Sequence, residues 1–204
     1  MSQYTVMFDA NGGTGGKTVV QDYGTALSAP MVSRKGYTFT GWSPAVPATV
    51  PAGGATYTAQ WKVNQYAVAF DANGGEGSVT NEQDYASEIV APEVSRTGYS
   101  FVSWSPEVGT TVPASNVVYT AQWSVNQYMA TFDANGGSGG KAVTQNYGTE
   151  LAAPTVTRTG YSFAGWRPSV PTTMPAADRT FVAQWTANQY TVTFDPDGGV
   201  GGWS

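Results

Sequence analysis

Carboxylates are the side chains of this 204-residue chain best placed to act as acids, bases or metal ligands, because the sequence contains no His and no Cys. Without these residues, Ser–His and Cys–His nucleophilic sites and thiolate–zinc sites are excluded within the chain. One carboxylate recurs in every copy of a repeated motif, at Asp9, Asp71, Asp133 and Asp195. A glycosidase needs two carboxylates that flank one cleft, and no second carboxylate recurs in every copy. We therefore expect no enzymatic activity and no cofactor.

The recurring carboxylate opens the motif Asp-Ala-Asn-Gly-Gly, which occupies residues 9–13 in its first copy. Asn and Gly tolerate positive φ, and the Asp side chain can accept hydrogen bonds from backbone N–H groups just ahead, so the motif predicts a hairpin turn. The alternative is weak calcium binding, because the motif resembles the start of a calcium loop. An EF-hand loop needs further oxygen ligands and a Glu at its twelfth position, where this chain has Val20. The plain turn is the favoured interpretation.

Three recurring tryptophans are candidates for binding a partner. Each falls out of phase with the Phe three residues before it, so we expect it to cover the other face of a sheet or to lie at a junction between repeats. If exposed, these residues would form a periodic row suited to stacking on sugars. They are Trp42, Trp104 and Trp166.

Three recurring arginines form a second candidate set, because each stands two residues before a Gly-Tyr pair. They are Arg34, Arg96 and Arg158. An Arg beside an aromatic ring can be offered to a partner, but Arg also stacks on rings for structural reasons. The structural role is favoured.

All of these residues return at a fixed interval of 62, as the tyrosines Tyr4, Tyr66, Tyr128 and Tyr190 show. A constant period of this size is typical of a repeat array. We divide the chain into three repeats, residues 3–64, 65–126 and 127–188, followed by the truncated start of a fourth, residues 189–204. We expect the strand of this truncated copy to dock on the third repeat, because it has no later strands of its own. The unfinished copy also leads us to expect that the chain is part of a larger protein.

Alternation of apolar and polar residues predicts about four strands in each repeat. In the first repeat these are the opening strand with Tyr4, Val6 and Phe8 on one face, a return strand at 17–22, a third at 37–42 and a last at 55–62. The tryptophans of the last strand are in phase with its buried aromatic residue, so we place Trp61, Trp123 and Trp185 in the core. Prolines exclude a regular helix or a central strand from residues 43–54. The sequence therefore predicts a mainly β fold.

Only residues 62–65 separate Trp61 of the first repeat from Tyr66 of the second, and they include no Gly and no Pro. This composition is unlike that of a flexible linker, so we expect consecutive repeats to contact each other. Each 62-residue repeat should be about 27 Å across, and three in line should form an elongated rod of roughly 80 Å. Open sheet edges would allow weak self-association of an otherwise monomeric chain.

Charge and hydropathy exclude two classes of partner. Charged residues make up only 11% of the chain and the net charge is −5, so there is no basic stripe to bind nucleic acid. No apolar run approaches the roughly 18 residues that a membrane span requires. We expect no membrane insertion, and no signal-peptide pattern precedes the first strand.

The order of motifs in the third repeat is FDANGG, YG, RTGYSFAGW and MPAADRTFVAQW. This succession closely resembles the Listeria–Bacteroides repeat family, which includes the B repeat of internalins, and the resemblance covers nearly the whole chain. It implies a small module similar to the β-grasp fold of ubiquitin. It also implies a location at the bacterial cell surface or in a secreted protein, and a role as a stalk or spacer associated with adhesion. The alternative is a multivalent module that binds a host glycan or surface protein through the repeated Trp and Arg positions.

The second repeat departs from this pattern at two glycines. Ala86 stands where the other repeats have Gly24 and Gly148, and Ser103 stands where they have Gly41 and Gly165. If these glycines need positive φ, we expect local strain or a different turn in the second repeat.

Overall fold

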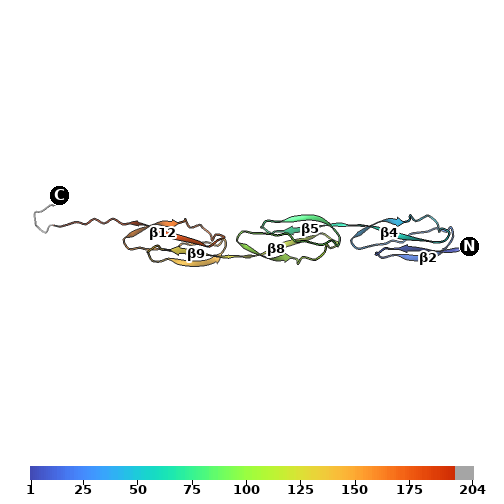
Figure 1. The fold of residues 1–204 in the computed structure, drawn as a ribbon, viewed down its shortest axis with the longest axis horizontal. Coiled ribbons are helices and arrows are strands. Elements are labelled where there is room, and N and C mark those ends of the chain that lie inside the picture. Colours follow the sequence, from blue (N-terminus) through green and yellow to red (C-terminus); the bar gives the residue numbers. More distant parts are fainter. Residues whose placement is uncertain (196–204) are drawn as a thin grey trace. The chain divides into compact units, whose positions relative to one another are not determined.

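The computed structural model describes residues 1–195, and its strands form three four-stranded sheets, one for each repeat (Figure 1). The first sheet contains β1 (Gln3–Asp9), β2 (Lys17–Asp22), β3 (Tyr37–Ser43) and β4 (Ala55–Val63). The second contains β5 (Gln65–Asp71), β6 (Val79–Asp84), β7 (Tyr99–Ser105) and β8 (Val117–Val125). The third contains β9 (Gln127–Asp133), β10 (Lys141–Asn146), β11 (Tyr161–Arg167) and β12 (Arg179–Ala187). The predicted mainly β fold with about four strands per repeat is confirmed.

Every sheet has the same topology, with its first and last strands side by side in the centre. The order in the first sheet is β2-β1-β4-β3. The outer pairs β1/β2 and β3/β4 are antiparallel, whereas the central pair β1/β4 is parallel, with Val6 opposite Ala55 and Asp9 opposite Thr58. The central strands of each repeat are therefore the ones nearest to its entry and exit in the chain.

The core of each repeat lies on one face of its sheet. In the first repeat Val6, Phe8 and Tyr57 from the two central strands are buried together with Val50, which comes from the irregular segment before β4. The segments between β2 and β3 and between β3 and β4 contain isolated bridges instead of regular structure, and no helix occurs among residues 1–195. The finer likeness to the β-grasp fold is therefore not confirmed.

A β-bulge places the candidate tryptophans on the opposite face of the sheet from the one expected. Phe39 pairs with Trp61 on β4 and Gly41 pairs with the next residue, Gln60, so Thr40 is an extra residue without a partner. Because the extra residue shifts the side-chain alternation by one, Trp42 returns to the face that carries Phe39. The prediction that Trp42 covers the other face or lies at a junction is wrong. The same bulge lies between Phe163 and Gly165 in the third repeat.

The chain divides into two compact units whose limit does not follow the repeat boundary. The first unit holds the first two repeats except for Thr97–Ser100 and residues 124–126, and these two segments are grouped with the third repeat in the second unit. The start of β7 is thus grouped with the repeat that follows it.

The described part of the truncated copy, residues 189–195, forms no strand. Its apolar side chains are open to solvent, with Tyr190 75% and Phe194 87% exposed. Residues 189–195 bury little of the apolar surface that would hold them in place, so the expected docking on the third repeat is not seen for this part of the truncated copy. Residues 196–204 lie outside the described part of the chain.

The two substituted glycines of the second repeat behave differently. Ala86 has φ of 63°, close to the 77° of Gly24 and the 75° of Gly148. Ser103, in contrast, is not among the residues with positive φ, whereas Gly41 has φ of 141°. The expected strain is therefore present at Ala86 only.

Candidate functional site

The Asp-Ala-Asn-Gly-Gly turn is held by its own side chains. The backbone N–H of Asn11 donates to Oδ1 of Asp9 at 2.9 Å, and Nδ2 of Asn11 donates to the carbonyl of Ala59 on β4 at 3.0 Å. Asn11 has φ of 48°, in the left-handed region that Asn tolerates better than most residues. The same bonds recur around Asn73 and Asn135. The recurring carboxylate therefore serves the turn.

A tryptophan of the last strand clamps this turn from the side. Nε1 of Trp61 donates to the carbonyl of Ala10 at 2.9 Å. Gly13 is required beneath the indole, because a Cβ there would lie 2.7 Å from the Trp61 ring and 2.6 Å from the carbonyl oxygen of Ser33. Trp61 itself is half-buried, so it joins the turn to the core instead of filling the centre of the core. Equivalent bonds are made by Trp123 and Trp185.

The candidate arginines close the other side of the turn. Nη1 of Arg34 donates to the carbonyl of Asn11 at 3.3 Å, and its guanidinium carbon lies 4.0 Å above the centre of the Tyr37 ring. Arg158 makes the same two contacts, and Arg96 donates to the carbonyl of Asn73 at 3.0 Å. These contacts are those of the structural role. Binding of a partner by the arginines stays a prediction.

The candidate tryptophans pack against the core with their rings in contact with two other rings. Trp42 is half-buried, with ring centres 5.2 Å from Phe8 and 5.5 Å from Phe39 in edge-to-face geometry. Trp104 and Trp166 lie in the same aromatic clusters of their repeats. Much of the surface that would stack on a sugar is thus occupied. Binding by these residues stays a prediction.

Titratable groups do not converge on a metal or catalytic centre in the described part of the chain. No three carboxylates of residues 1–195 lie close enough together to hold a metal ion. None of the described residues belongs to a helix long and apolar enough to cross a membrane.

The first and second repeats contact each other as expected, but the sequence did not reveal which residues make this contact. The ring of Tyr85, just after β6, lies over Gly36 and meets Tyr37 edge to face at 5.9 Å. A Cβ on Gly36 would collide with that ring. Asn64, between β4 and β5, donates its backbone N–H to Gly36 at 2.9 Å and accepts from the N–H of Tyr85 at 2.8 Å. We call this the tyrosine junction.

The tyrosine junction recurs one period later. Gly98 and Tyr99 contact Tyr147, and Asn126 bonds to the backbone of Gly98 and Tyr147 as Asn64 does to theirs. The sequence did carry a signal for this contact, because a Tyr after the second strand and a Gly-Tyr pair before the third recur at the same period. Nothing in the local pattern says that these two features meet across a repeat boundary.

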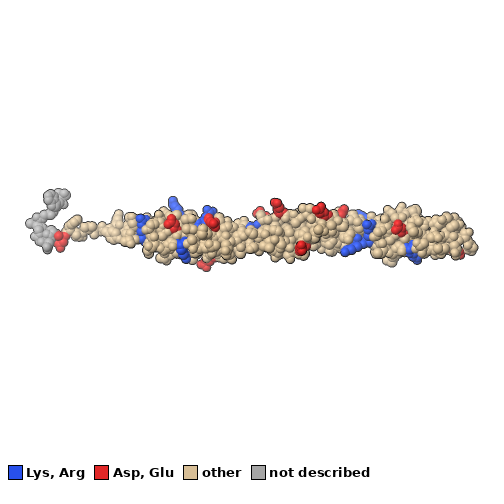
Figure 2. All heavy atoms as spheres, turned by 60° about the horizontal axis from the view of Figure 1, so that its bottom comes forward, with Lys and Arg blue, Asp and Glu red and all other residues tan. Residues whose placement is uncertain are grey.

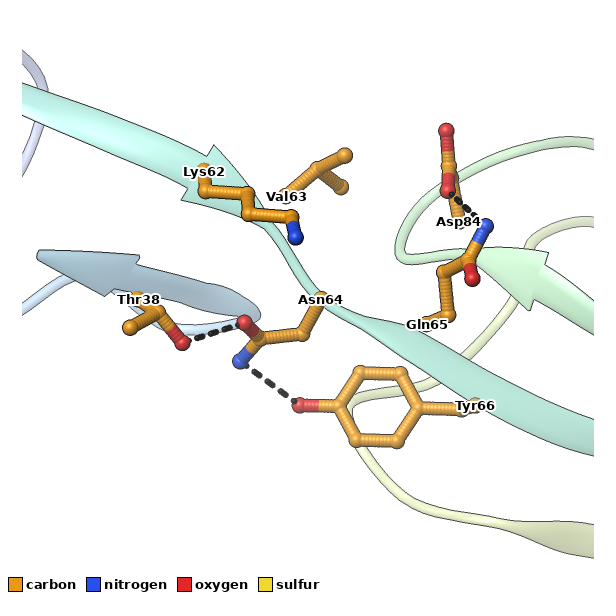
Figure 3. Close-up of a pocket in the computed structure, with 7 residues that line it drawn as sticks. All are labelled: Thr38, Lys62, Val63, Asn64, Gln65, Tyr66 and Asp84. Atoms are coloured by element: carbon orange, nitrogen blue, oxygen red, sulfur yellow. Dashed lines mark hydrogen bonds between the residues drawn. The ribbon is translucent and has the colours of Figure 1, made fainter. Parts of the chain in front are cut away.

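A hollow of ≈ 730 Å³ lies beside the first tyrosine junction (Figure 3). Its polar side chains mostly bond to one another: Oγ1 of Thr38 to Oδ1 of Asn64 at 2.6 Å, and Nε2 of Gln65 to Oδ1 of Asp84 at 2.9 Å. Figure 3 shows these pairs on the two sides of the chain segment that joins β4 to β5. Because most of these polar groups are already paired, the hollow is better suited to joining two repeats than to holding a ligand.

Comparison with known proteins shows what the chain is similar to. The model of the Listeria–Bacteroides repeat domain matches it three times, over residues 4–63, 66–123 and 128–184. A Gly-rich membrane protein of Evansella cellulosilytica is 30% identical over 96% of this chain and 26% of that protein. A second membrane protein of this organism is 28% identical over 94% of this chain and 33% of its own length.

Internalin H of Listeria monocytogenes is 32% identical over 64% of this chain and 27% of its own length. The chain therefore spans between a quarter and a third of the length of the curated relatives that it matches.

Proposed function

Because the chain belongs to the Listeria–Bacteroides repeat family, we propose that it is a non-catalytic stalk or spacer segment of a bacterial surface or secreted protein. The observation that carries this proposal is the parallel pairing of the first and last strands in each repeat. The names of the relatives, two membrane proteins and an internalin, support the surface location.

Parallel central strands make the chain enter each repeat at one end and leave it at the other. In the first repeat Gln3 lies three residues before the paired segment, and Val63 lies five residues beyond it. Along the strand direction the two ends are therefore separated by about 36 Å, at about 3.3 Å per residue. Each repeat adds this length to the chain while it stays folded, which is what a spacer requires.

The same pairing makes each repeat suited to bearing load. A pull on Gln3 and Val63 acts along β1 and β4 in opposite directions, so the hydrogen bonds between them are sheared and must break together. In a hairpin pulled from its open end, by contrast, the bonds break one after another. The sheared segment is also buried, because Val6 and Phe8 lie in the core beside Tyr57. Water therefore cannot readily replace its hydrogen bonds.

The tyrosine junction supports a stalk whose repeats do not swing freely. Asn64 bonds to Gly36 in the first repeat and to Tyr85 in the second, so one residue of the short connection ties both repeats to it. The edge-to-face contact of Tyr37 with Tyr85 adds apolar area to these bonds.

The alternative function is a multivalent module that binds a host glycan or surface protein at the repeated Trp and Arg positions. The ring contacts of Trp42 and the bonds of Arg34 favour the stalk over this alternative. Its test is binding of the purified chain to glycans and matrix proteins, compared with a single 62-residue repeat. Saturable binding that strengthens from one repeat to three would favour the alternative.

Single-molecule pulling on the ends of the full chain tests the stalk proposal. We expect three separate unfolding events, each lengthening the chain by roughly 190 Å, the difference between 62 extended residues and one folded repeat. As a control, a pull between Cys residues placed at Gln3 and Asp22, which are neighbours on β1 and β2, should open the first repeat at a much lower force. Equal forces for the two directions would contradict the load-bearing geometry.

A further inference from the structure

The second repeat holds a non-glycine residue in a conformation that favours glycine. Ala86 has φ of 63°, whereas Gly24 and Gly148 hold the same place in the other two repeats. A Cβ on Gly24 or Gly148 would meet no atom within 4 Å, so the strain at this position comes from the backbone and not from crowding. By the usual cost of a left-handed conformation for a non-glycine residue, Ala here shifts the balance toward the open state by about fivefold or more.

A second difference raises the conformational entropy of the second repeat in its unfolded state. Gly109 stands where the first and third repeats have Pro47 and Pro171. Pro restricts the unfolded chain and Gly leaves it free, so the second repeat loses more conformational entropy when it folds. Space does not demand the glycine, because a Cβ on Gly109 would lie 3.7 Å from its nearest neighbour, an ordinary contact distance.

Charge separates the second repeat from its neighbours as well. It contains seven carboxylates and one Arg, a net charge of −6, whereas the first repeat carries +2 and the third +1. Glu82, Asp84 and Glu88 line one shallow groove along β6, and none of them forms an ion pair among residues 1–195. Acidic side chains accordingly predominate over the second repeat in Figure 2. Like charges repel in the compact state, and salt screens that repulsion.

The strained residue Ala86 and the acidic residues Asp84 and Glu88 lie close together in the sequence, at the turn that carries the tyrosine junction. Ala86 directly follows Tyr85, and its N–H donates to the carbonyl of Val112 at 3.0 Å. The N–H of Val112 in turn donates to Ser87 at 2.9 Å, and Val112 is buried in the core of the repeat. If this turn opens, the end of β6 leaves the core segment around Val112, and Tyr85 leaves Gly36.

We propose that the second repeat is the built-in weak point of the chain and that it opens first, starting at the turn of residues 84–87, while the first and third repeats stay folded. The mechanical meaning of this device rests on the proposed stalk function. In a loaded stalk, the second repeat would lengthen the chain by roughly 190 Å before either neighbour yields. The stalk would then extend in steps instead of failing as a whole.

Hydrogen exchange of the full chain, followed by mass spectrometry, tests the order of opening without any load. We expect amides of residues 79–90 to exchange at least about fivefold faster than those of the equivalent segments 17–28 and 141–152, after correction for intrinsic rates. Equal or slower exchange of residues 79–90 would overturn the proposal. Because this result does not depend on force, it stands or falls separately from the pulling experiment on the stalk.

Matched variants test whether the conformation of Ala86 causes the faster exchange of residues 79–90. Ala86→Gly should slow exchange of residues 79–90 by about fivefold or more and leave residues 141–152 unchanged. Gly148→Ala, which places the same residue in the third repeat, should accelerate residues 141–152 by a similar factor. Gly109→Pro and added salt should each slow exchange in the second repeat as well. If Ala86→Gly leaves exchange of residues 79–90 unchanged, the turn is not where opening starts and the proposal fails.

Discussion

Each repeat has two turns that differ in how they are held and in whether their sequence varies. The turn after its first strand reads Asp-Ala-Asn-Gly-Gly in all three complete copies. In the first repeat it is held from outside, because Asn11 donates to the Ala59 carbonyl and the turn accepts hydrogen bonds from Trp61 and Arg34. The turn after the second strand reads Tyr-Gly in two repeats and Tyr-Ala in the other. In the first repeat its glycine, Gly24, faces open space.

The difference shows that positive φ alone does not decide whether a glycine can be replaced. Gly13 does not have positive φ, yet a Cβ there would meet a backbone oxygen and an indole ring. Gly24 has φ of 77° and meets nothing. Backbone strain of this kind is tolerable, as Ala86 demonstrates, whereas a collision with backbone atoms forces the packing around it to move.

The substitution Gly13→Ala should have the largest effect. We expect it to destabilise the first repeat by about 3 kcal/mol, because the added methyl group collides with the Ser33 carbonyl and the Trp61 ring, and neither can shift without breaking a bond. Hydrogen exchange of β1 and β4 amides in the full chain measures this loss. A loss no larger than that of Gly24→Ala would remove the distinction between the two turns.

Trp61→Phe should come next, at about 1.5 kcal/mol. The variant keeps most of the apolar contact but removes one of the two hydrogen bonds that the Ala10 carbonyl accepts, so that only the bond from the Gly13 N–H remains. Trp61→Ala serves as a comparison that removes the apolar contact as well as this bond, and it should cost more. If Trp61→Phe is as stable as the parent chain by the same exchange measurement, the clamp contributes only packing.

Gly24→Ala should destabilise the first repeat by about 1 kcal/mol, because only backbone strain is added. Its counterpart, Ala86→Gly, should stabilise the second repeat by a similar amount. Comparison of the two in one exchange experiment sharpens the contrast between the turns, and opposite signs are required. Effects of the same sign would show that the two positions are not equivalent.

Tyr85→Ala should have the smallest effect on stability, less than about 1 kcal/mol, because it removes one edge-to-face contact near the surface. Its effect on the junction should be larger. With spin labels on Cys residues placed in the first and second repeats, we expect the variant to broaden the distribution of distances between the labels. Tyr23→Ala, at the equivalent position of the first repeat, is the control and should leave the distribution unchanged.

Periodicity was the property most readily predicted from the sequence, together with the strands and the hairpin turn. The interval of 62 and the alternation around Val6 and Phe8 are local or strictly repeated features, so they need no knowledge of the fold. The structural role of Arg34 beside Tyr37 could also be favoured in advance, since the two residues stand close together in the chain.

The candidate site was harder to predict, because its contacts join residues far apart in the sequence. Trp61 bonds to Ala10, 51 residues earlier. Tyr85 of the second repeat contacts Tyr37 of the first. Composition and spacing indicate that such residues recur, but which of them touch depends on the strand order and on the path of the irregular segments.

The sequence by itself determined the repeat period, the mainly β character and the absence of His and Cys chemistry, because these follow from residue identity and order alone. Only the tertiary structure decided the face on which Trp42 lies, since the extra residue Thr40 shifts the alternation and only strand pairing reveals it. It also decided that Ala86 takes the glycine conformation while Ser103 does not. The physical reason is that side-chain direction and backbone strain are set by partner strands, and those partners lie tens of residues away along the chain.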